Sequence, residues 1–356
     1  MRAGGFKAVS RMTRAALGVA AFAILLQPAA AALLACHARN AQSKESVQKV
    51  AMRVVNATNV PTQITWIDFE SHQRPYFTLQ PGKSQLQNTY VTHPWIAVST
   101  TGQCMCGHIA EADASGNDEW VLEPFEPTVS YAKETFAGFA VNVSAHLVAD
   151  AALHDKSVKY VEKMLSDMST RLPRPAVAAL QKTTALWLEH SDCRKPAGEY
   201  HPSREWLKEN NVNPDKAKSV QFNADHLHWG ETQPAMSLHE FAHAFHDIYL
   251  RGDNPEVLKA FAQACRSGKY DNVDYALGGK KRAYALNNQM EFFAELSEAY
   301  FWRNDFEPFD RDALAKFDPD SMAVIERMWR SPLGVPNAGD TGAAMSCAEA
   351  MKAAQQ

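Results

Sequence analysis

Two histidines four residues apart suggest a metal site, in the sequence His239-Glu240-Phe241-Ala242-His243. In an α-helix, residues i and i+4 project from one face, so both imidazoles can bind the same ion. Neutral imidazoles suit Zn²⁺, and the carboxylate of Glu240 can take the proton of a water that attacks a carbonyl. The motif therefore predicts two zinc ligands and a general base. A catalytic zinc needs a third protein ligand, which must come from elsewhere in the chain.

A helix must present these side chains on one face. We expect it to begin at Pro234, with Thr232 as a cap, and to end at Gly252. His246 extends the row of histidines, and we interpret it as a structural residue or a partner of a ligand. The apolar residues form a neighbouring stripe that predicts burial: Leu238, Phe241, Ala242, Phe245, Ile248 and Tyr249.

A different interpretation of the same residues involves no metal. Ser237 and Glu240 have the spacing of a capping box, in which Glu240 would only stabilise the start of a helix. The position of Pro234 favours an earlier helix start, so we give the metal interpretation more weight.

The segment 288–301 can supply the third ligand. It reads as a helix that is apolar on most sides, yet Glu291, Glu295 and Glu298 follow one another at i, i+4 and i+7. Carboxylates on a largely buried helix need partners, which a zinc ion and its histidines would provide. The alternative is an acidic stripe that faces solvent.

These two segments together resemble the catalytic domain of anthrax toxin lethal factor and its relatives, the gluzincin zinc metallopeptidases. The resemblance rests on His-Glu-Phe-Ala-His and on Tyr284-Ala-Leu-Asn-Asn-Gln-Met-Glu291-Phe-Phe-Ala-Glu295. It implies that Glu291 is the third zinc ligand, that Tyr284 donates a hydrogen bond to the oxyanion, and that Glu295 orients a histidine. The match is close over the two helices and loose over residues 130–332.

The composition and the N-terminus indicate an exported globular protein. The chain has 356 residues and a net charge of −4, and no basic block follows the N-terminus, which argues against a nucleic-acid partner. Basic residues precede an apolar run from Ala15 to Leu26, so residues 1–36 are predicted to be a signal peptide. Cys36 could instead become a lipidated first residue that anchors the chain to a membrane, and an uncleaved anchor is a third possibility. All three place the chain in the periplasm, at the cell surface or outside the cell.

The chain has five further cysteines, and some of them are expected to form disulfides. The sequence does not reveal which cysteines pair. The five are Cys104, Cys106, Cys193, Cys265 and Cys347. Cys104, Cys106 and His108 form a tight cluster that could bind a metal, although its spacing is shorter than that of the usual structural zinc sites.

The chain divides into an all-β part and a mainly helical part. Residues 48–124 contain short β-rich runs separated by turn signals, which predicts a small β-sandwich, and a Pro-rich linker follows it. Residues 130–335 alternate strand and helix patterns and predict a mainly α, α+β domain, which the resemblance to the gluzincins implies to be of the zincin type. In it we expect Ser219 to Asn223 to form the edge strand that lines the cleft and pairs with substrate backbone. Residues 336–356 are expected to be a flexible tail.

The β part resembles the β domain of the von Hippel-Lindau tumour suppressor. The resemblance covers the run from Ile64 to Gly82 and the run from Thr89 to Trp95. That domain binds a hydroxyproline-containing peptide. The resemblance implies a pocket for proline- or hydroxyproline-containing segments, and the matching positions are Trp66, Tyr76, Thr89, His93 and Trp95. Without the resemblance, aromatic residues on short strands would be read as core.

The sequence thus predicts an exported zinc metallopeptidase that hydrolyses peptide bonds and carries a peptide-binding β module. The alternative is a catalytically silent zinc-binding surface protein that acts in peptide binding or adhesion. Glu240 and Tyr284 favour the enzyme, because a structural metal site needs no general base.

Overall fold

The computed structural model describes residues 33–34, 36, 41–194, 198–231, 233–339 and 343–354. The predicted apolar run of the signal peptide and the predicted cap Thr232 lie outside the described residues. Among the helices that are described, none combines the length and the apolar character needed to cross a bilayer.

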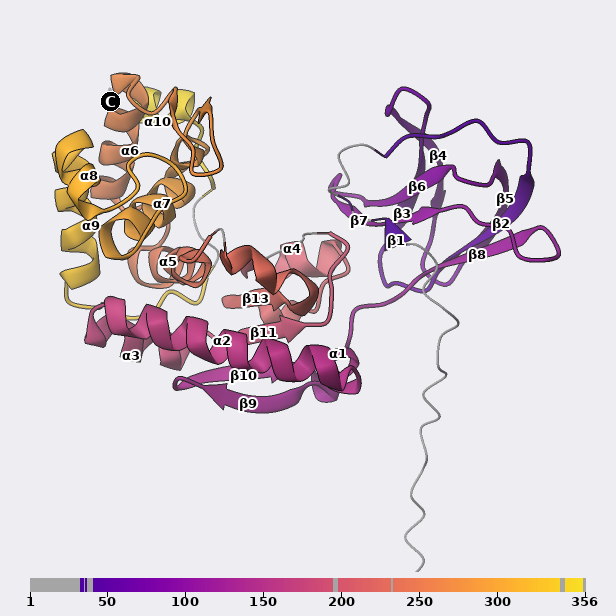
Figure 1. Cartoon of the computed structure of the whole chain (residues 1–356), viewed down its shortest axis with the longest axis horizontal. Helices are drawn as coiled ribbons and strands as arrows, with labels where there is room; N and C mark the ends of the chain where they lie inside the picture. Colours follow the sequence, from indigo (N-terminus) through magenta and orange to yellow (C-terminus); the bar gives the residue numbers. More distant parts are fainter. Residues whose placement is uncertain are drawn as a thin grey trace, which may run out of the picture. The chain divides into compact units, whose positions relative to one another are not determined.

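The N-terminal module consists of two sheets, as the sequence predicts. One sheet has the strand order β1-β7-β6-β3-β4 and the other has the order β5-β2-β8 (Figure 1). The strands are β1 (Leu33–Leu34), β2 (Lys49–Asn56), β3 (Thr62–Ile67), β4 (Gln73–Leu79), β5 (Ser84–Tyr90), β6 (Pro94–Ser99), β7 (Cys104–Ile109) and β8 (Asn117–Leu122).

Alternating side chains of these strands form the core of the module. In β2, Val50, Met52 and Val54 are buried, while the residues between them are more exposed. They pack with Ile64 and Trp120 in one hydrophobic cluster. This period of two is what a strand with one face on a core requires.

Strand β7 was not predicted, because its sequence Cys-Met-Cys-Gly-His-Ile lacks the usual β-branched pattern. The metal cluster suggested for this stretch is wrong. Cys104 is bonded to Cys36 and Cys106 to Cys193, so neither sulfur can bind a metal as a thiolate. His108 is buried and its Nε2 atom lies 2.7 Å from an oxygen of Asp118.

The pairing of Cys36 also corrects the prediction of a lipid anchor. The Sγ atom that would carry the lipid forms the bond to Cys104. Leu33 and Leu34 pair with His108 and Gly107, so these residues of the predicted signal segment belong to the sheet.

The C-terminal domain contains a five-stranded mixed sheet of order β12-β13-β11-β10-β9. Its strands are β9 (Ala132–Phe136), β10 (Phe139–Val143), β11 (Leu186–Glu189), β12 (Gly198–His201) and β13 (Ser219–Asn223). The three central strands are parallel, and the two outer strands are antiparallel to their neighbours. A short hairpin of β14 (Val273–Asp274) and β15 (Lys280–Lys281) lies apart from this sheet.

The prediction that Ser219–Asn223 forms an edge strand is wrong. This strand, β13, is buried at all five residues because β11 and β12 pair with it on both sides. The outer strand is β12, which the sequence did not reveal. Gly198 begins β12 where a Cβ atom would lie 2.5 Å from the buried ring of Phe222, so only glycine fits at this crossing.

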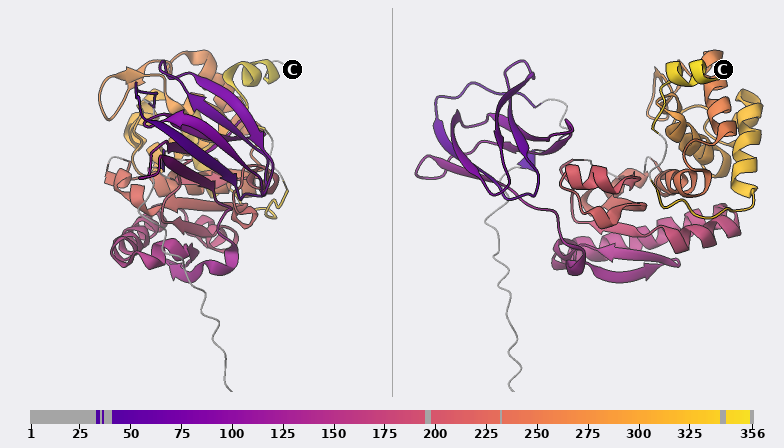
Figure 2. Two further views of the ribbon diagram at one scale, coloured as in Figure 1. Left: turned by 90° about the vertical axis from the view of Figure 1, so that its right-hand side faces the viewer. Right: turned by 180° about the vertical axis from the view of Figure 1, so that it is seen from behind.

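Ten α-helices are described, and α5 and α7 lie close to where the sequence predicts helices. The bounds are α1 (Ala145–Ala149), α2 (Ala151–Arg171), α3 (Arg174–Thr183), α4 (Arg204–Glu209), α5 (Met236–Leu250), α6 (Pro255–Ser267), α7 (Gln289–Phe301), α8 (Arg311–Phe317), α9 (Pro319–Arg330) and α10 (Cys347–Ala353). Helix α2 runs along the sheet in Figure 1 and in the right-hand view of Figure 2. The apolar face of the sheet and the helices share one hydrophobic core.

Helix α5 begins two residues later than Pro234 and has no side-chain cap at Ala235. Ser237 is buried within its first turn, and its hydroxyl lies 3.5 Å from the carbonyl oxygen of Met164, so the capping-box interpretation is wrong. At the other end, Arg251 has φ of 62° and Gly252 donates its N–H to the carbonyl of His246. This left-handed C-terminus agrees with the predicted stop at Gly252.

Helices α5 and α7 pack through aromatic rings. Phe245 of α5 stacks on Trp329 of α9 at a centroid distance of 4.2 Å, and Phe293 of α7 stacks on the same indole at 5.8 Å. The indole N–H of Trp329 donates to the hydroxyl of Ser297, at 2.8 Å. All of these side chains are buried, so they fix α5 and α7 relative to each other.

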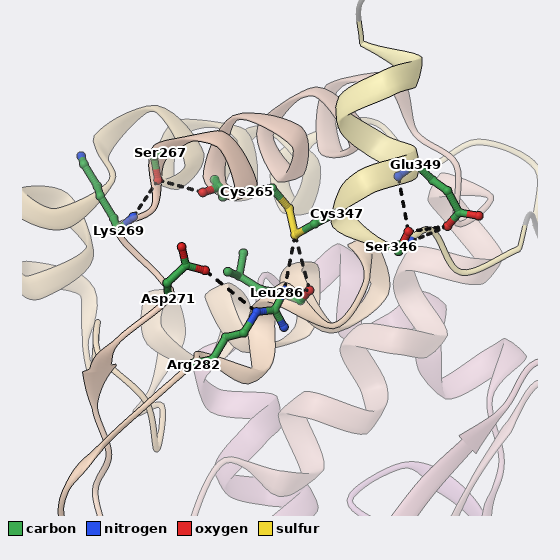
Figure 3. Close-up of a disulfide and its surroundings, with 10 residues drawn as sticks. Cys265, Ser267, Lys269, Asp271, Arg282, Leu286, Ser346, Cys347 and Glu349 are labelled. Atoms are coloured by element: carbon green, nitrogen blue, oxygen red, sulfur yellow. Dashed lines mark hydrogen bonds and ion pairs between the residues drawn. A yellow bond between two sulfur atoms is a disulfide. The ribbon is translucent and has the colours of Figure 1, made fainter.

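The C-terminal residues do not form a flexible tail throughout. Cys347 at the start of α10 is bonded to Cys265 of α6, and a capping box of Ser346 and Glu349 begins the helix (Figure 3). The segment before it contacts Gln289 of α7, whose side chain donates to the carbonyl of Ala343 and accepts from the N–H of Met345. The prediction missed this because Cys347 stands alone in a small, polar sequence.

We expect the double variant Cys265→Ser/Cys347→Ser to lower the free energy of unfolding by about 2–4 kcal/mol, because the bond closes a loop of 82 residues in the unfolded chain. Guanidinium titration followed by circular dichroism measures the change. The variant Ser331→Ala, at an exposed position after α9, serves as the control. An unfolding midpoint equal to that of the wild type would show that the bond contributes nothing.

Candidate functional site

Two helices bring three metal-binding side chains to one point. His239 and His243 project from α5, and Glu291 projects from the first turn of α7. The Nε2 atoms of the two histidines are 3.1 Å apart, and each lies 3.1 Å from Oε2 of Glu291. Asn288 caps α7 by accepting the N–H groups of Met290 and Glu291, which fixes the start of the helix that carries the carboxylate.

This triangle of donor atoms fits a metal ion. A ring nitrogen offers one hydrogen or one lone pair in the ring plane, so three mutual contacts of 3.1 Å cannot all be linear hydrogen bonds. Ligands about 2.0–2.1 Å from a tetrahedral zinc ion are separated by about 3.3 Å. The edges of the triangle are close to that length, and the set of two imidazoles and one carboxylate suits Zn²⁺. The structure therefore brings the predicted residues His239, His243 and Glu291 together at a spacing that could hold a metal ion.

A carboxylate on the next turns of α7 orients the first histidine. Nδ1 of His239 lies 2.6 Å from Oε1 of Glu298 but 3.7 Å from Oε1 of Glu295. If Nδ1 donates to Glu298, Nε2 directs its lone pair toward the triangle. The prediction assigned this role to Glu295, and the structure gives the hydrogen bond to Glu298. Both lie on the helix face of Glu291, at i+4 and i+7, so spacing alone could not separate them.

Several ionisable side chains are buried around the three donor atoms of His239, His243 and Glu291. Burial alone would lower the pKa of His239, but its hydrogen bonds to Glu291 and Glu298 outweigh burial and raise it well above the ordinary value. Burial raises the pKa of Glu295 and of Glu298, and each is raised further by the charge of its acidic neighbours. Burial also raises the pKa of Glu291. The interactions with His243 and His239 outweigh burial and hold this pKa far below the ordinary value. The site thus attracts positive charge.

Glu240 and Tyr284 lie next to this triangle, as predicted. Glu240 is 9% exposed, and its negative charge contributes to the raised pKa values of His239 and Glu298. The hydroxyl of Tyr284 donates to Oε1 of Glu291 at 3.4 Å, and its ring centroid is 6.3 Å from that of His239. Tyr284 is half exposed, so this hydroxyl can also reach a bound molecule.

A small cavity of about 130 Å³ adjoins His243 and Glu291. Tyr200 of the edge strand β12 lines it, and the hydroxyl of Tyr200 donates to Asp247 at 2.5 Å. His246 lines it as well and is buried, stacking on Phe293 at a centroid distance of 4.8 Å. Burial lowers the pKa of His246 to about 3, so its ring is neutral. His246 is therefore a core residue beside the site and not a ligand in the triangle.

The five predicted residues of the β module also converge. They line a cavity of about 930 Å³, a size common for ligand sites. Trp66 stacks on His93 at a centroid distance of 5.5 Å, and Tyr76 meets Trp95 edge-on at 4.9 Å. The register shifts between Ile64 and Thr65, which leaves Tyr76 as the extra residue of a bulge. Such a bulge re-aims a side chain, and here the ring joins the cavity.

A hydroxyl and an imidazole form the polar part of this cavity. The indole N–H of Trp95 donates to the hydroxyl of Thr89 at 3.2 Å, and this oxygen is 3.4 Å from Nδ1 of His93. Burial lowers the pKa of His93, which keeps its ring neutral near pH 7. The sequence reasoning missed Phe69 and Tyr90, which line the same cavity and lie within 5.5 Å of His93 by ring centroid. Both are large exposed apolar residues, and that exposure was not visible in the sequence.

The comparison with known protein families gives a match in the N-terminal β module. Residues 39–103 match the model of the family described as VHL beta domain, which confirms the resemblance of the N-terminal module. The match contains all five predicted cavity residues. Comparison of the chain with curated proteins finds no significant match. The N-terminal module is thus similar to the VHL beta domain, and the helical domain that follows it is described by its geometry.

Proposed function

We propose that the chain is an exported zinc metallopeptidase whose β module binds a segment of its protein substrate. The observation that carries the proposal is the triangle of His239, His243 and Glu291 with 3.1 Å edges. Glu298 behind His239 supports it, because ligating histidines usually donate their other nitrogen to a carboxylate. The resemblance of α5 and α7 to gluzincins of the lethal factor type points to the same activity.

Zinc bound here would supply Lewis acidity, which lowers the pKa of a bound water and polarises a substrate carbonyl. Glu240, which follows His239 in the sequence, would accept the proton of the attacking water and pass it to the leaving amine. The hydroxyl of Tyr284 can turn from Glu291 to donate to the oxyanion as negative charge develops. Glu298 holds His239 in the tautomer that keeps Nε2 free.

Strand β12 is the element that would align the substrate. It is the outer strand of the sheet, antiparallel to β13, and its Tyr200 lines the cavity beside His243 and Glu291. An extended peptide can add to such an edge through main-chain hydrogen bonds. This placement would bring a peptide bond past the metal ligands while the side chains point alternately toward and away from α5.

The cavity of the β module has the composition needed for a proline ring. Trp66, Tyr76 and Trp95 offer aromatic walls, and Thr89 and His93 offer a hydroxyl and a neutral imidazole. A pyrrolidine ring would pack against the walls, and a hydroxyl on that ring would exchange hydrogen bonds with Thr89 and His93. We therefore propose a proline- or hydroxyproline-containing segment as the occupant.

Export is supported by the cysteines. The six cysteines of the chain form three disulfides: Cys36–Cys104, Cys106–Cys193 and Cys265–Cys347. Stable disulfides of this kind are common in secreted and periplasmic proteins and rare in reducing compartments. The basic and apolar start of the chain agrees with the same destination.

The variant Glu240→Gln separates an enzyme from a silent zinc-binding protein. We expect cleavage of a mixed peptide library by the zinc-loaded protein to fall by about 10²–10⁴-fold, because the amide cannot accept the proton of the water. Zinc content, measured by inductively coupled plasma mass spectrometry, should stay at the wild-type level. If wild type and variant cleave the library equally, Glu240 is not the general base. If neither cleaves any peptide, the silent protein is the better description.

The variant Glu291→Ala tests the ligand set. Removing one of three ligands should reduce zinc affinity by at least 10-fold, since changes even behind the ligands have effects of that size. Competition with a fluorescent zinc chelator measures the affinity. The variant Glu326→Ala on α9, a residue that pairs with Arg330 at the surface, should bind zinc like the wild type. Equal affinity of the Glu291 variant would disprove the assignment.

The variant Thr89→Val tests the polar part of the β cavity. It keeps the shape of the side chain but removes the hydroxyl. Titration calorimetry of the full protein with a hydroxyprolyl peptide and its prolyl counterpart should show tighter binding of the former by the wild type. We expect the variant to lose about 5- to 10-fold of that preference. The variant Thr78→Val, at an exposed position of β4, is the control. If the wild type binds neither peptide, the proposal for this cavity fails.

A further inference from the structure

We propose that the disulfide between Cys265 and Cys347 is a redox-sensitive clamp, whose reduction by an external dithiol lowers the affinity of the proposed metal site. The bond ties α10 to α6. Figure 3 shows Arg282 and Leu286 directed at the sulfur of Cys347, so the clamp touches the loop that precedes α7. This inference rests on the proposed function, since it concerns the regulation of the same site.

One contact of the clamp reaches the turn that carries Tyr284. The guanidinium of Arg282 lies 3.5 Å from Sγ of Cys347 and donates to the carbonyl oxygen of Leu286 at 2.9 Å. The same carbonyl oxygen lies 3.6 Å from Sγ of Cys347. Tyr284 begins a short 3₁₀ turn that ends at Leu286, so the residues on both sides of it in the sequence are held at the disulfide.

A second contact reaches the start of α7. Gln289 is the first residue of this helix and is buried. Its side-chain amide donates to the carbonyls of Ala343 and Gly252, at 3.1 and 3.2 Å, and accepts from the N–H of Met345 at 2.7 Å. Glu291 follows two residues later, so the segment that the disulfide ties down also holds the helix end that presents this carboxylate. A buried amide is costly without its partners, so release of the segment would loosen that end.

The bond lies where a small dithiol can reach it, and Arg282 favours its opening. Both cysteines are partly exposed, and the neighbours Ser346 and Ala348 are exposed. The guanidinium is nearer to Sγ of Cys347, at 3.5 Å, than to the carboxylate of Asp271, at 4.0 Å. A positive charge at this distance stabilises Cys347 as a thiolate, which makes it the better leaving group.

Reduction would proceed by thiol–disulfide exchange. A thiolate of the dithiol attacks Sγ of Cys265, the bond to Cys347 breaks, and Cys347 leaves as a thiolate. The second thiol of the reagent loses its proton and displaces Cys265, which closes the reagent into a cyclic disulfide. Two electrons and, through solvent, two protons thus pass from the dithiol to the protein, which gains two thiols. The seven-residue helix α10 then loses its covalent tie and frays, because so short a helix depends on tertiary support.

Hydrogen exchange tests the clamp in the absence of metal. The full metal-free protein is compared in its oxidised form and after reduction with dithiothreitol, which is removed by gel filtration without oxygen. We expect residues 282–291 and 343–353 to exchange several-fold faster after reduction, while the buried strand β13 keeps its protection. Equal exchange of residues 282–291 in the two forms would overturn the proposal.

The variant Cys265→Ser/Cys347→Ser assigns the effect to this bond. Its residues 282–291 should exchange fast without any reductant and should not respond to reduction. We expect its zinc affinity, measured by competition with a fluorescent chelator, to be about 10-fold below that of the oxidised wild type, which is the size of effect seen for groups behind metal ligands. An effect of reduction on residues 282–291 as large as in the wild type would implicate another disulfide and overturn the proposal.

Two further variants make the result specific. Cys36→Ser/Cys104→Ser lacks a disulfide of the β module and should bind zinc like the wild type. A loss of affinity there equal to that of Cys265→Ser/Cys347→Ser would show that general destabilisation decides. Gln289→Met keeps the clamp closed but removes its contact to α7, so its zinc affinity should also fall. If Cys265→Ser/Cys347→Ser does not fold, Gln289→Met takes its place, and wild-type affinity in Gln289→Met would overturn the proposal.

The outcomes distinguish this inference from the proposed function. If the wild type and Cys265→Ser/Cys347→Ser bind zinc with equal affinity, the clamp is wrong while the metal site stands. If the wild type binds no zinc, the proposed function fails and this inference fails with it, whatever the exchange rates.

Discussion

The packing of α5 against α7 is the constraint on which the site depends. The three donor atoms come from two helices, so their 3.1 Å spacing holds only while the helices keep a fixed separation and rotation. The stacked rings of Phe245, Phe293 and Trp329 supply that fixation from behind. Buried aromatic rings interdigitate at the density of an organic crystal, so a shift of either helix would open a void. The apolar core thus sets the geometry of the polar site.

The site also concentrates negative charge in the interior. Glu291, Glu295 and Glu298 share one face of α7, and Glu240 faces them from α5. Unpaired carboxylates in such surroundings are costly, and the raised pKa values of Glu295 and Glu298 express that cost. A buried Oε2 atom of Glu295 has no hydrogen-bond partner among the described residues. The arrangement is stabilised by positive charge at His239, carried by a proton or by a metal ion.

Sequence periodicity predicted the two helices of this site well. It did not predict the strand order, which depends on tertiary pairing. The 3.6-residue pattern located α5 and α7 within a few residues, and helical spacing brought out the ligand set. The order of strands is set by long-range pairing, so β13 was placed at the edge and the short β12 was missed. The choice between Glu295 and Glu298 depends on side-chain conformation, which spacing does not report.

The β module illustrates the same limit. Trp66 and Trp95 are paired across β3 and β6, so register explains their meeting, but Tyr76 reaches the cavity through a bulge. Resemblance to a known domain identified these positions, whereas strand patterns alone would have assigned the rings to a core. Phe69 and Tyr90 remained hidden because Phe69 lies in the turn after β3 and Tyr90 is the last residue of β5, where the alternation of a strand does not show which way a side chain points.

The bond between Cys265 and Cys347 has a consequence for the synthesis of the chain. Cys347 lies 82 residues after Cys265 in the sequence, and the segment before it binds Gln289 at the start of α7. Domains generally fold from the N-terminus as they are made, so the β module can form long before this clamp exists. The helix that carries Glu291 receives this support only after residues 343–347 have been made. A chain that stops before Ala343 would therefore contain every proposed ligand and lack the brace that holds one of them.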